Sequence, residues 1–264
     1  MEINRSNINE LVNKCSVKPD KDYGQNFLVE PQIAEKIVNC LELEKEDKVL
    51  EIGPGLGSLT HFLFKKCQLD VCDIDYRMID FLKIFYKEDI NFILNDVRKI
   101  DVSGYTKIIG NLPYNITTEL VTFLLLNSSA KKMVLMCQSE AFNRFYDLSG
   151  ENYGPVSILL HLLGTSKKVL TVKPGSFYPA PKCNSLVFIF DSNPTVDKET
   201  AINVYKMSNT IFLNRRKTIL NNLSNVAGKE KAVSILKELN IEENRRPETI
   251  SPADYLQIYL RIKN

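Results

Sequence analysis

The stretch Val49-Leu50-Glu51-Ile52-Gly53-Pro54-Gly55-Leu56-Gly57 decides the fold of this 264-residue chain. Its apolar first half predicts a short buried strand, and its three glycines predict a sharp turn into a helix. Glycine at such a turn lets the backbone approach a ligand closely. The G-x-G-x-G spacing differs from the G-x-G-x-x-G spacing that seats a pyrophosphate at a helix N-terminus. The stretch therefore predicts an α/β fold with a ligand-binding turn.

Strands and helices alternate after this turn. We expect strands at 48–52, 69–73, 90–94, 107–110 and 133–137, and helices at 57–66, 75–87, 116–127 and 154–163. This alternation predicts βαβ units that form a doubly wound, mostly parallel sheet covered on both faces. Two further apolar runs, 168–172 and 185–190, flank the proline-rich loop 174–181 and predict an antiparallel pair at the far edge of the sheet.

The pattern changes near residue 192. Residues 191–195 predict a linker, and beyond them only helical periodicity remains. We therefore expect a Rossmann-like domain with an N-terminal arm over residues 1–192, and a small all-helical domain over residues 193–264.

Composition excludes several classes of protein. Hydrophobic residues make up 44% of the chain and charged residues 25%, which is typical of a globular protein. No apolar run is long enough to cross a membrane, and residues 1–10 lack the apolar core of a secretory signal. Two histidines and six cysteines without a C-x-x-C pair predict a cytoplasmic protein without a metal site. The cysteines are Cys15, Cys40, Cys67, Cys72, Cys137 and Cys183.

Basic residues concentrate near the C-terminus, although the whole chain carries a net charge of only +2. Residues 1–180 hold 21 Lys and Arg against 23 Asp and Glu, whereas residues 181–264 hold 13 against 9. The clusters Arg215-Arg216-Lys217 and Arg245-Arg246 suggest a polyanionic partner, and we expect the helical domain to bind RNA. The alternative is a solvated charged face on ordinary helices, because excess charge is a weak signal.

Acidic residues indicate which ligand the glycine turn binds. Asp73 ends the second strand, where a carboxylate can accept hydrogen bonds from both hydroxyls of a ribose, and Asp96 follows the third strand, where an adenine ring would lie. A glycine turn and one acidic residue are compatible with either a dinucleotide or a sulfonium cofactor as the ligand. Glu51 favours S-adenosylmethionine, because a carboxylate suits a cation and repels a pyrophosphate. We therefore predict a site for S-adenosylmethionine at Glu51, Gly53, Gly55, Asp73 and Asp96. The alternative is a tight turn with strand-end caps.

Asn111-Leu112-Pro113-Tyr114, after the fourth strand, has residue types suited to methylating an amine. The exocyclic amine of adenine is a poor nucleophile, because its lone pair is delocalised into the ring. Two acceptors, the Asn111 side-chain oxygen and the Leu112 carbonyl, would draw its nitrogen towards tetrahedral geometry. Pro113 fixes the turn, and Tyr114 can stack on an extruded base. Positioning and electrostatics would then supply most of the rate without a strong base. The alternative is an ordinary Asn-x-Pro turn.

Together these motifs resemble one family. The chain carries Tyr23-Gly-Gln-Asn-Phe-Leu28, the glycine stretch 49–57, Gly110-Asn-Leu-Pro-Tyr-Asn115, Phe177-Tyr-Pro-Ala-Pro-Lys182 and Arg215-Arg-Lys-Thr218. From about residue 20 to its C-terminus it resembles the KsgA (RsmA) family of ribosomal RNA small subunit adenine dimethyltransferases. The resemblance implies a class I S-adenosylmethionine-dependent methyltransferase fold with a C-terminal helical domain. It also implies dimethylation at N6 of two adjacent adenosines in a loop near the 3′ end of 16S rRNA, during small-subunit biogenesis.

The resemblance implies roles for individual residues. It places Asn26, Leu28, Gly53, Asp73, Asp96 and Asn111 at or near the cofactor. It places Asn111, Leu112 and Tyr114 around the target base, with Phe177 over the other face of that base. From the charge distribution we expect Arg215, Arg216 and Lys217 to contact RNA. The expected partner is the immature 30S subunit, and we expect a monomer.

The chain departs from the family pattern at three positions: Asp73 replaces the usual glutamate, Asn184 an aspartate and Asn214 a glutamine. Two relatives leave alternatives open. The Erm family of 23S rRNA adenine methyltransferases shares the overall plan, but it usually carries Gly-Ala-Gly-Lys-Gly and Asn-Ile-Pro-Tyr. Mitochondrial transcription factors share the fold as binding proteins. A catalytically silent RNA-binding assembly or transcription factor is therefore the second alternative.

Overall fold

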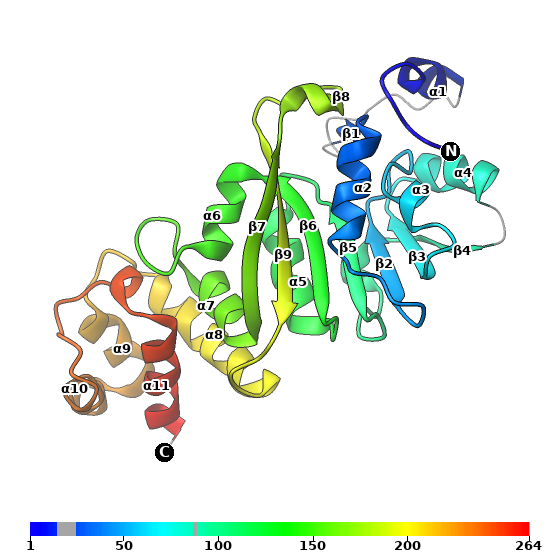
Figure 1. The fold of residues 1–264 in the computed structure, drawn as a ribbon. Helices are drawn as coiled ribbons and strands as arrows, with labels where there is room; N and C mark the ends of the chain where they lie inside the picture. Colours follow the sequence, from blue (N-terminus) through cyan, green and yellow to red (C-terminus); the bar gives the residue numbers. More distant parts are fainter. Residues whose placement is uncertain (15–24, 87–88, 264) are drawn as a thin grey trace. The chain divides into compact units, whose positions relative to one another are not determined.

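Seven strands form one sheet, in the order β4-β3-β2-β5-β6-β9-β7 (Figure 1). The computed structural model describes residues 1–14, 25–86 and 89–263, so Cys15, Tyr23 and Gly24 lie outside its described part. The strands are β2 (Lys48–Ile52), β3 (Gln68–Asp73), β4 (Ile90–Leu94), β5 (Lys107–Asn111), β6 (Lys132–Gln138), β7 (Gly164–Val172) and β9 (Ser185–Ser192). The first five are parallel to one another and lie within one residue of their expected bounds. β9 runs antiparallel to β6, and β7 lies at the edge beside it.

A second, two-stranded ladder joins two distant parts of the sequence. β1 (Phe27–Leu28) pairs antiparallel with β8 (Phe177–Tyr178), so that Leu28 lies opposite Phe177. The ladder ties the segment before the glycine turn to the proline-rich loop. Its two-residue strands are too short to give an alternating pattern, and the sequence does not predict them.

Eleven helices are present in the described part of the chain. They are α1 (Ile8–Lys14), α2 (Pro31–Asn39), α3 (Thr60–Leu63), α4 (Tyr76–Phe85), α5 (Thr117–Asn127), α6 (Ser139–Tyr146), α7 (Pro155–Leu163), α8 (Lys198–Phe212), α9 (Ile219–Ala227), α10 (Lys229–Glu238) and α11 (Pro252–Lys263). The helix expected over 57–66 is a single turn, because Gly57 still belongs to the glycine turn and Phe64 leaves the helical region at ψ 129°. Short 3-10 turns lie at Val97–Lys99, Pro174–Ser176 and Pro247–Thr249.

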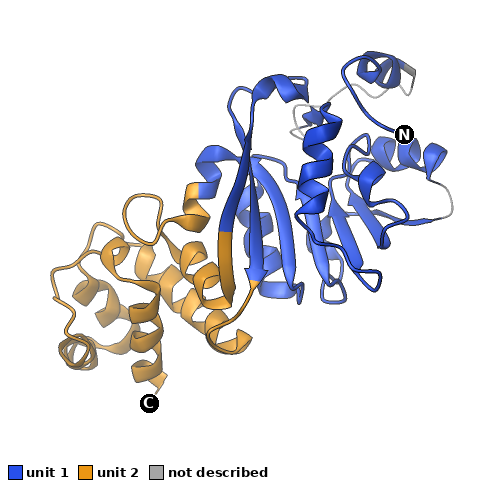
Figure 2. Cartoon of the chain, in the orientation of Figure 1, with its two compact units in different colours: residues 1–142, 167–191 blue, residues 143–166, 192–264 orange. Residues whose placement is uncertain are grey.

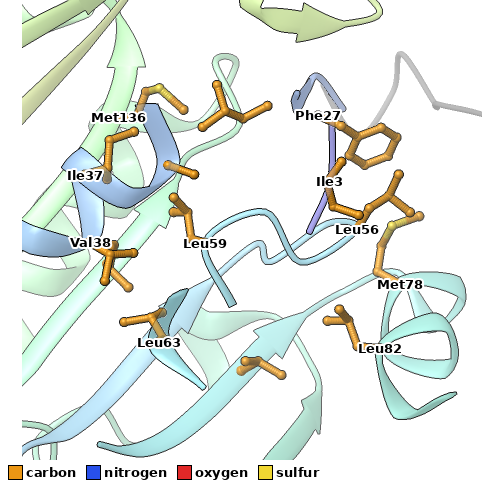
Figure 3. Packing of buried hydrophobic residues seen from close by; sticks show 14 of the residues in the cluster. Ile3, Phe27, Ile37, Val38, Leu56, Leu59, Leu63, Met78, Leu82 and Met136 are labelled. Atoms are coloured by element: carbon orange, nitrogen blue, oxygen red, sulfur yellow. The ribbon is translucent and has the colours of Figure 1, made fainter. Parts of the chain in front are cut away.

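Apolar side chains alternate between the two faces of the sheet. On β6, Val134 and Met136 join a buried cluster with residues of α2, α4 and the glycine turn (Figure 3). Met133 and Leu135 are buried outside that cluster, and α5 lies on the face of the sheet opposite α2 (Figure 1). Burial on both faces is what a doubly wound sheet requires, and it leaves the carboxyl ends of the strands for a binding site.

The chain divides into two compact units (Figure 2). The first contains residues 1–142 and 167–191, and the second contains 143–166 and 192–264. These units differ from the expected division into 1–192 and 193–264, because residues 143–166 group with the C-terminal helices. The reason is α7, which buries an almost wholly apolar sequence and packs against α8. Because α7 directly precedes a strand of the sheet in the sequence, its packing against α8 is not evident from the sequence.

Two negative findings concern the described residues alone. No helix among residues 1–14, 25–86 and 89–263 is long and apolar enough to span a membrane. In the same part of the chain, no group of three or more His, Cys, Asp or Glu side chains is placed to hold a metal ion.

Candidate active site

A pocket lies at the carboxyl ends of β2, β3 and β5. The strand order reverses between β2 and β5, and such a switch point is where open α/β sheets bind ligands. The pocket wall includes ten of the predicted residues: Asn26, Leu28, Glu51, Gly53, Gly55, Asp73, Asn111, Leu112, Pro113 and Tyr114. An adjoining pocket is lined by Asp96 and shares Gly53, Asp73, Ile74, Pro113 and Ile116 with the first.

The glycine turn brings main-chain atoms to the pocket wall. Gly53 and Gly55 have φ angles of +63° and +55°, which residues with a side chain disfavour. A Cβ atom on Gly55 would lie 3.0 Å from the Phe27 ring, closer than an ordinary contact. The Gly53 N–H donates to the Cys72 carbonyl at 2.9 Å and so fixes the turn against β3. The conformation therefore requires glycine at both positions.

Asp73 presents its carboxylate to both pockets. Its Oδ1 accepts a hydrogen bond from the Asp75 N–H at 2.9 Å. Burial nevertheless raises the pKa of Asp73 to about 6, because desolvation outweighs these backbone hydrogen bonds. Hydroxyl donors from a ligand would replace the water that the carboxylate has lost. The next residue, Ile74, is 56% exposed and lines both pockets. Sequence analysis misses this residue, although an apolar side chain directly after a strand-end acid is a visible signal.

Glu51 is almost fully buried at the floor of the glycine turn. Its Oε2 accepts from the Thr60 hydroxyl at 2.8 Å, while Oε1 has no hydrogen-bond partner among the described residues. Burial raises the pKa of Glu51 to about 8, and the charge of Asp73 contributes in the same direction. The side chain can therefore hold a proton near neutral pH and still offer an acceptor to a cation.

The Asn111 amide has a fixed orientation. Its Nδ2 donates to the Asn26 carbonyl at 3.1 Å, and a carbonyl can only accept, so the nitrogen must face Asn26. Oδ1 is buried in the pocket region and has no partner in the described part of the chain. Asn26 thus acts through its main chain, and the arrangement leaves one amide oxygen for a ligand donor.

The rest of the Asn-Leu-Pro-Tyr stretch is held by contacts with β6, α5 and β9. The Leu112 N–H donates to the Met136 carbonyl at 2.9 Å, and the Pro113 carbonyl accepts from the Thr117 hydroxyl at 2.9 Å. The Tyr114 hydroxyl shares a hydrogen bond of 2.6 Å with the fully buried Ser185 on β9. No sequence motif predicts this contact, because Tyr114 and Ser185 are 71 positions apart in the chain.

Asp96 is more constrained than its position in the sequence suggests. It caps the 3-10 turn Val97–Lys99, and Arg98 grips its carboxylate with Nε at 2.9 Å and Nη2 at 2.5 Å. The Arg98 guanidinium lowers the pKa of Asp96. Arg98 also lines the adjoining pocket and was not singled out from the sequence.

Phe177 is not among the residues that line these two pockets. Its side chain is 4% exposed and belongs to the buried cluster. The β1–β8 ladder places it opposite Leu28, which does line the first pocket. Its contact with a base stays a prediction, and it requires the Phe177 ring to move.

In the basic cluster Arg215-Arg216-Lys217 of the second unit, the first residue makes contacts within the protein and the other two are exposed. Arg215 donates through Nη2 to the Gly150 carbonyl at 2.5 Å, lies 3.5 Å from a Glu248 carboxylate oxygen and stacks 5.7 Å from the Phe212 ring centre. Arg216 and Lys217 are exposed. Their turn is closed by the Lys217 N–H on the Asn214 carbonyl at 2.8 Å.

In the pair Arg245-Arg246, too, one arginine makes contacts within the protein and the other is exposed. Arg245 is held by the hydroxyl and carbonyl of Thr249, and its own carbonyl accepts from the Ile219 N–H at 2.7 Å. Arg246 is exposed. The structure therefore brings the two basic segments side by side through Ile219, and it leaves Arg216, Lys217 and Arg246 at the surface.

The fold and the pocket together define a class I methyltransferase. The sheet order, the glycine turn after β2, the acid ending β3 and the Asn-Leu-Pro-Tyr stretch after β5 lie at one edge of the sheet. A dimethyladenosine transferase from Plasmodium falciparum has a similar structure, with a TM-score of 0.75, 24% identity and coverage of 90% of this chain and 97% of that one. The 23S rRNA methyltransferase ErmE has a TM-score of 0.72, 19% identity and coverage of 90% and 100%. These likenesses show the shared fold.

Sequence comparison is more specific. Residues 17–264 match the family described as ribosomal RNA adenine dimethylase. The ribosomal RNA small subunit methyltransferase A of Malacoplasma penetrans is 35% identical over 255 residues, which cover 94% of this chain and 93% of that protein. The protein of the same name from Mesoplasma florum is 37% identical over 262 residues, with 92% and 98% covered. This chain belongs to the ribosomal RNA adenine dimethylase family.

Proposed function

We propose that this chain transfers methyl groups from S-adenosylmethionine to N6 of two adjacent adenosines in a loop near the 3′ end of 16S rRNA. The observation that carries the proposal is the Asn111 amide. Because Asn26 holds its nitrogen, its buried oxygen has no hydrogen-bond partner among the described residues, and Asn111 lines the pocket. A buried acceptor without a partner costs about 1–3 kcal/mol, and a ligand donor would recover that cost.

The pocket residues fit S-adenosylmethionine, which supplies a methyl group on a positively charged sulfur when bound. Asp73 offers acceptors to the ribose hydroxyls, and Asp96 lies in the adjoining pocket where the adenine would follow. Glu51 offers a buried acceptor with no partner in the described chain, which favours a cation over a pyrophosphate. Gly53 and Gly55 keep side chains out of the wall.

Three residues act on the target base. Asn111 Oδ1 and the Leu112 carbonyl accept the two hydrogens of the exocyclic amine, which frees the nitrogen lone pair for attack. Tyr114, fixed by Ser185, offers its ring face to an extruded adenine. These interactions are fixed before the reaction, so they lower the barrier without reorganisation. Phe177 would close over the other face of the base.

The substrate is proposed to be the immature 30S subunit in the cytoplasm, bound by a monomer of this protein. Arg216 and Lys217 support this proposal, because exposed cations neutralise phosphates and release counterions. Arg215 contributes indirectly, by holding the turn that carries the other two.

Transfer of labelled methyl groups to immature 30S and 50S particles tests the proposal. Dimethylated adenosine near the 3′ end of 16S rRNA is the expected product, read by mass spectrometry of nuclease digests. Label in 23S rRNA instead would indicate the Erm-type activity. Binding of the particle without any transfer would indicate a silent assembly factor.

A further inference from the structure

The same local clamp occurs twice in the first unit. Asp75 caps α4 and is gripped by Arg77 two residues later, through Nε at 2.9 Å and Nη2 at 2.6 Å. Asp96 caps the 3-10 turn Val97–Lys99 and is gripped by Arg98 with almost the same distances. In each clamp the aspartate also accepts the N–H of its arginine at 3.0 Å. Local geometry alone therefore explains why each clamp forms.

The two clamps differ in what surrounds them. Asp75 is 3% exposed, and neither it nor Arg77 lines the two pockets of the active site. Asp96 and Arg98 both line the adjoining pocket, whose other walls are mostly apolar: Ile52, Ile74, Val97, Pro113, Ile116 and Leu120. Arg98 extends further, to Glu119 on α5, with Nη1 2.5 Å from Oε1. A flat heterocycle between apolar walls would meet a carboxylate at its edge.

We propose that Arg98 is a specificity-determining residue that holds the Asp96 carboxylate in place to accept a hydrogen bond from the exocyclic amine of the adenine of S-adenosylmethionine. The inference rests on the proposed cofactor. Arg98 acts through Asp96, so it is a positioning residue.

The hydrogen-bond capacity of Asp96 allows this role. Its two oxygens offer about four acceptor sites. The Arg98 N–H and Nε occupy Oδ1, and Nη2 occupies Oδ2, where Nε makes only a longer contact of 3.1 Å. A site on Oδ2 therefore remains for a ligand donor. Arg98 also lowers the pKa of Asp96, so the carboxylate stays ionised and can only accept. Both effects favour a ligand that carries an amine over one that does not.

Calorimetry with two ligands tests the inference without turnover. One ligand is S-adenosylhomocysteine, and the other is its 6-deamino analogue, which carries hydrogen in place of the exocyclic amine. The wild type should prefer the amine by about tenfold to a hundredfold, the scale of a hydrogen bond to a charged group. Arg98→Ala should reduce that preference at least threefold, mainly by weakening S-adenosylhomocysteine.

Arg77→Ala is the matched control, because it breaks the same clamp outside the two pockets. It should keep the wild-type preference. Glu119→Gln, which loosens the outer end of Arg98, should give a smaller reduction than Arg98→Ala.

Each other outcome has a definite meaning. If Arg98→Ala keeps the full preference, or if the wild type binds both ligands equally, the inference is wrong while the proposed cofactor stands. If the wild type binds neither ligand, the proposed cofactor itself fails. Should Arg98→Ala not fold, Arg98→Lys keeps a charge but loses the paired geometry. An undiminished preference in that variant would overturn the inference.

Discussion

The Asn111 amide in the pocket of the first unit and the Arg215 guanidinium in the basic turn of the second unit use their hydrogen-bonding groups in opposite ways. In the pocket, Glu51 Oε1 and Asn111 Oδ1 are buried without hydrogen-bond partners among the described residues. In the turn, the guanidinium of Arg215 meets the Gly150 carbonyl, the Glu248 carboxylate and the Phe212 ring. Both regions are recognisable in the sequence as short polar motifs, but only the structure shows that their side chains have different roles.

The difference teaches how to distinguish functional groups from structural ones. An unpartnered buried acceptor lowers stability, and a ligand can recover that cost where the residue lines a pocket, as Asn111 does. Glu248 Oε2 and Asn222 Oδ1 also lack hydrogen-bond partners among the described residues but line neither active-site pocket. The Arg215 guanidinium already donates to a main-chain carbonyl, pairs with Glu248 and lies over the Phe212 ring, so it stabilises the fold. Pocket substitutions should therefore change ligand binding or turnover, and substitution of Arg215 should change stability.

The largest effect is expected for Asn111→Ala. Removing the oriented amide oxygen takes away one preorganised acceptor, which is worth about 2–4 kcal/mol of transition-state stabilisation, or about 30- to 1000-fold in kcat. Affinities for S-adenosylhomocysteine and for 30S particles should change far less. Single-turnover methyl transfer, with calorimetry on the same preparation, measures both. Full turnover by this variant would contradict the proposed base site.

The second prediction concerns Glu51→Gln and pH. Burial raises the folded-state pKa of Glu51 from its ordinary value of 4.5 to about 8. Between about pH 4.5 and 8 the folded state therefore binds more protons at Glu51 than the unfolded state, and wild-type stability falls as pH rises. Glutamine does not titrate. The stability of the variant relative to the wild type should rise by roughly 3–4 kcal/mol across that window, since the pKa of Glu51 rises from 4.5 to about 8 and one pKa unit corresponds to about 1.4 kcal/mol. Thermal unfolding between pH 5 and 8 measures the difference, and a constant difference would contradict the buried proton.

Most of the fold follows from sequence periodicity. The five parallel strands appear within one residue of expectation, because each is a short apolar run between turn signals. The two apolar runs that flank the proline-rich loop form β9 and β7 at one edge of the sheet, as expected. The grouping of residues 143–166 with the C-terminal helices could not be predicted, because an apolar helix packs equally well against either unit. Tertiary contacts alone decide which it joins.

The pocket was more predictable than its supporting contacts. Ten predicted residues line it, because strand-end motifs in a parallel sheet meet at one edge. Arg215 could not be distinguished from Arg216 in the sequence, because the different contacts of two adjacent arginines depend on the fold. The resemblance places Phe177 over the target base, and that contact stays a prediction, because its side chain is 4% exposed and belongs to the buried cluster. Ser185 contacts the Tyr114 side chain and Arg98 contacts the Asp96 side chain. Residue spacing in the sequence does not predict such supporting contacts.

The third prediction compares Arg215 with its neighbours. Arg215→Ala removes a charged hydrogen bond and leaves Glu248 unpaired, so it should lower the stability of the second unit by about 1–3 kcal/mol. The salt dependence of 30S binding should stay near that of the wild type. The control Arg216→Ala/Lys217→Ala should show the reverse, with an unchanged melting temperature and a salt slope smaller by about one for each lost phosphate contact. A flattened slope for Arg215→Ala without loss of stability would place Arg215 on the RNA.

The smallest effect is expected for Ser185→Ala, which tests a satisfied polar group inside the pocket region. Ser185 holds the Tyr114 hydroxyl at 2.6 Å, and a net hydrogen bond of this kind is worth about 0.5–1.5 kcal/mol. If the bond serves to fix the Tyr114 ring for stacking, its loss should raise KM for the RNA particle about two- to tenfold and leave kcat and S-adenosylhomocysteine affinity nearly unchanged. Tyr114→Phe removes the same bond from the other side and keeps the ring. The double variant should therefore resemble either single variant, because the bond can be lost only once. Additive effects, or a fall in melting temperature with no change in KM, would show that the bond stabilises β9 and does not position the ring.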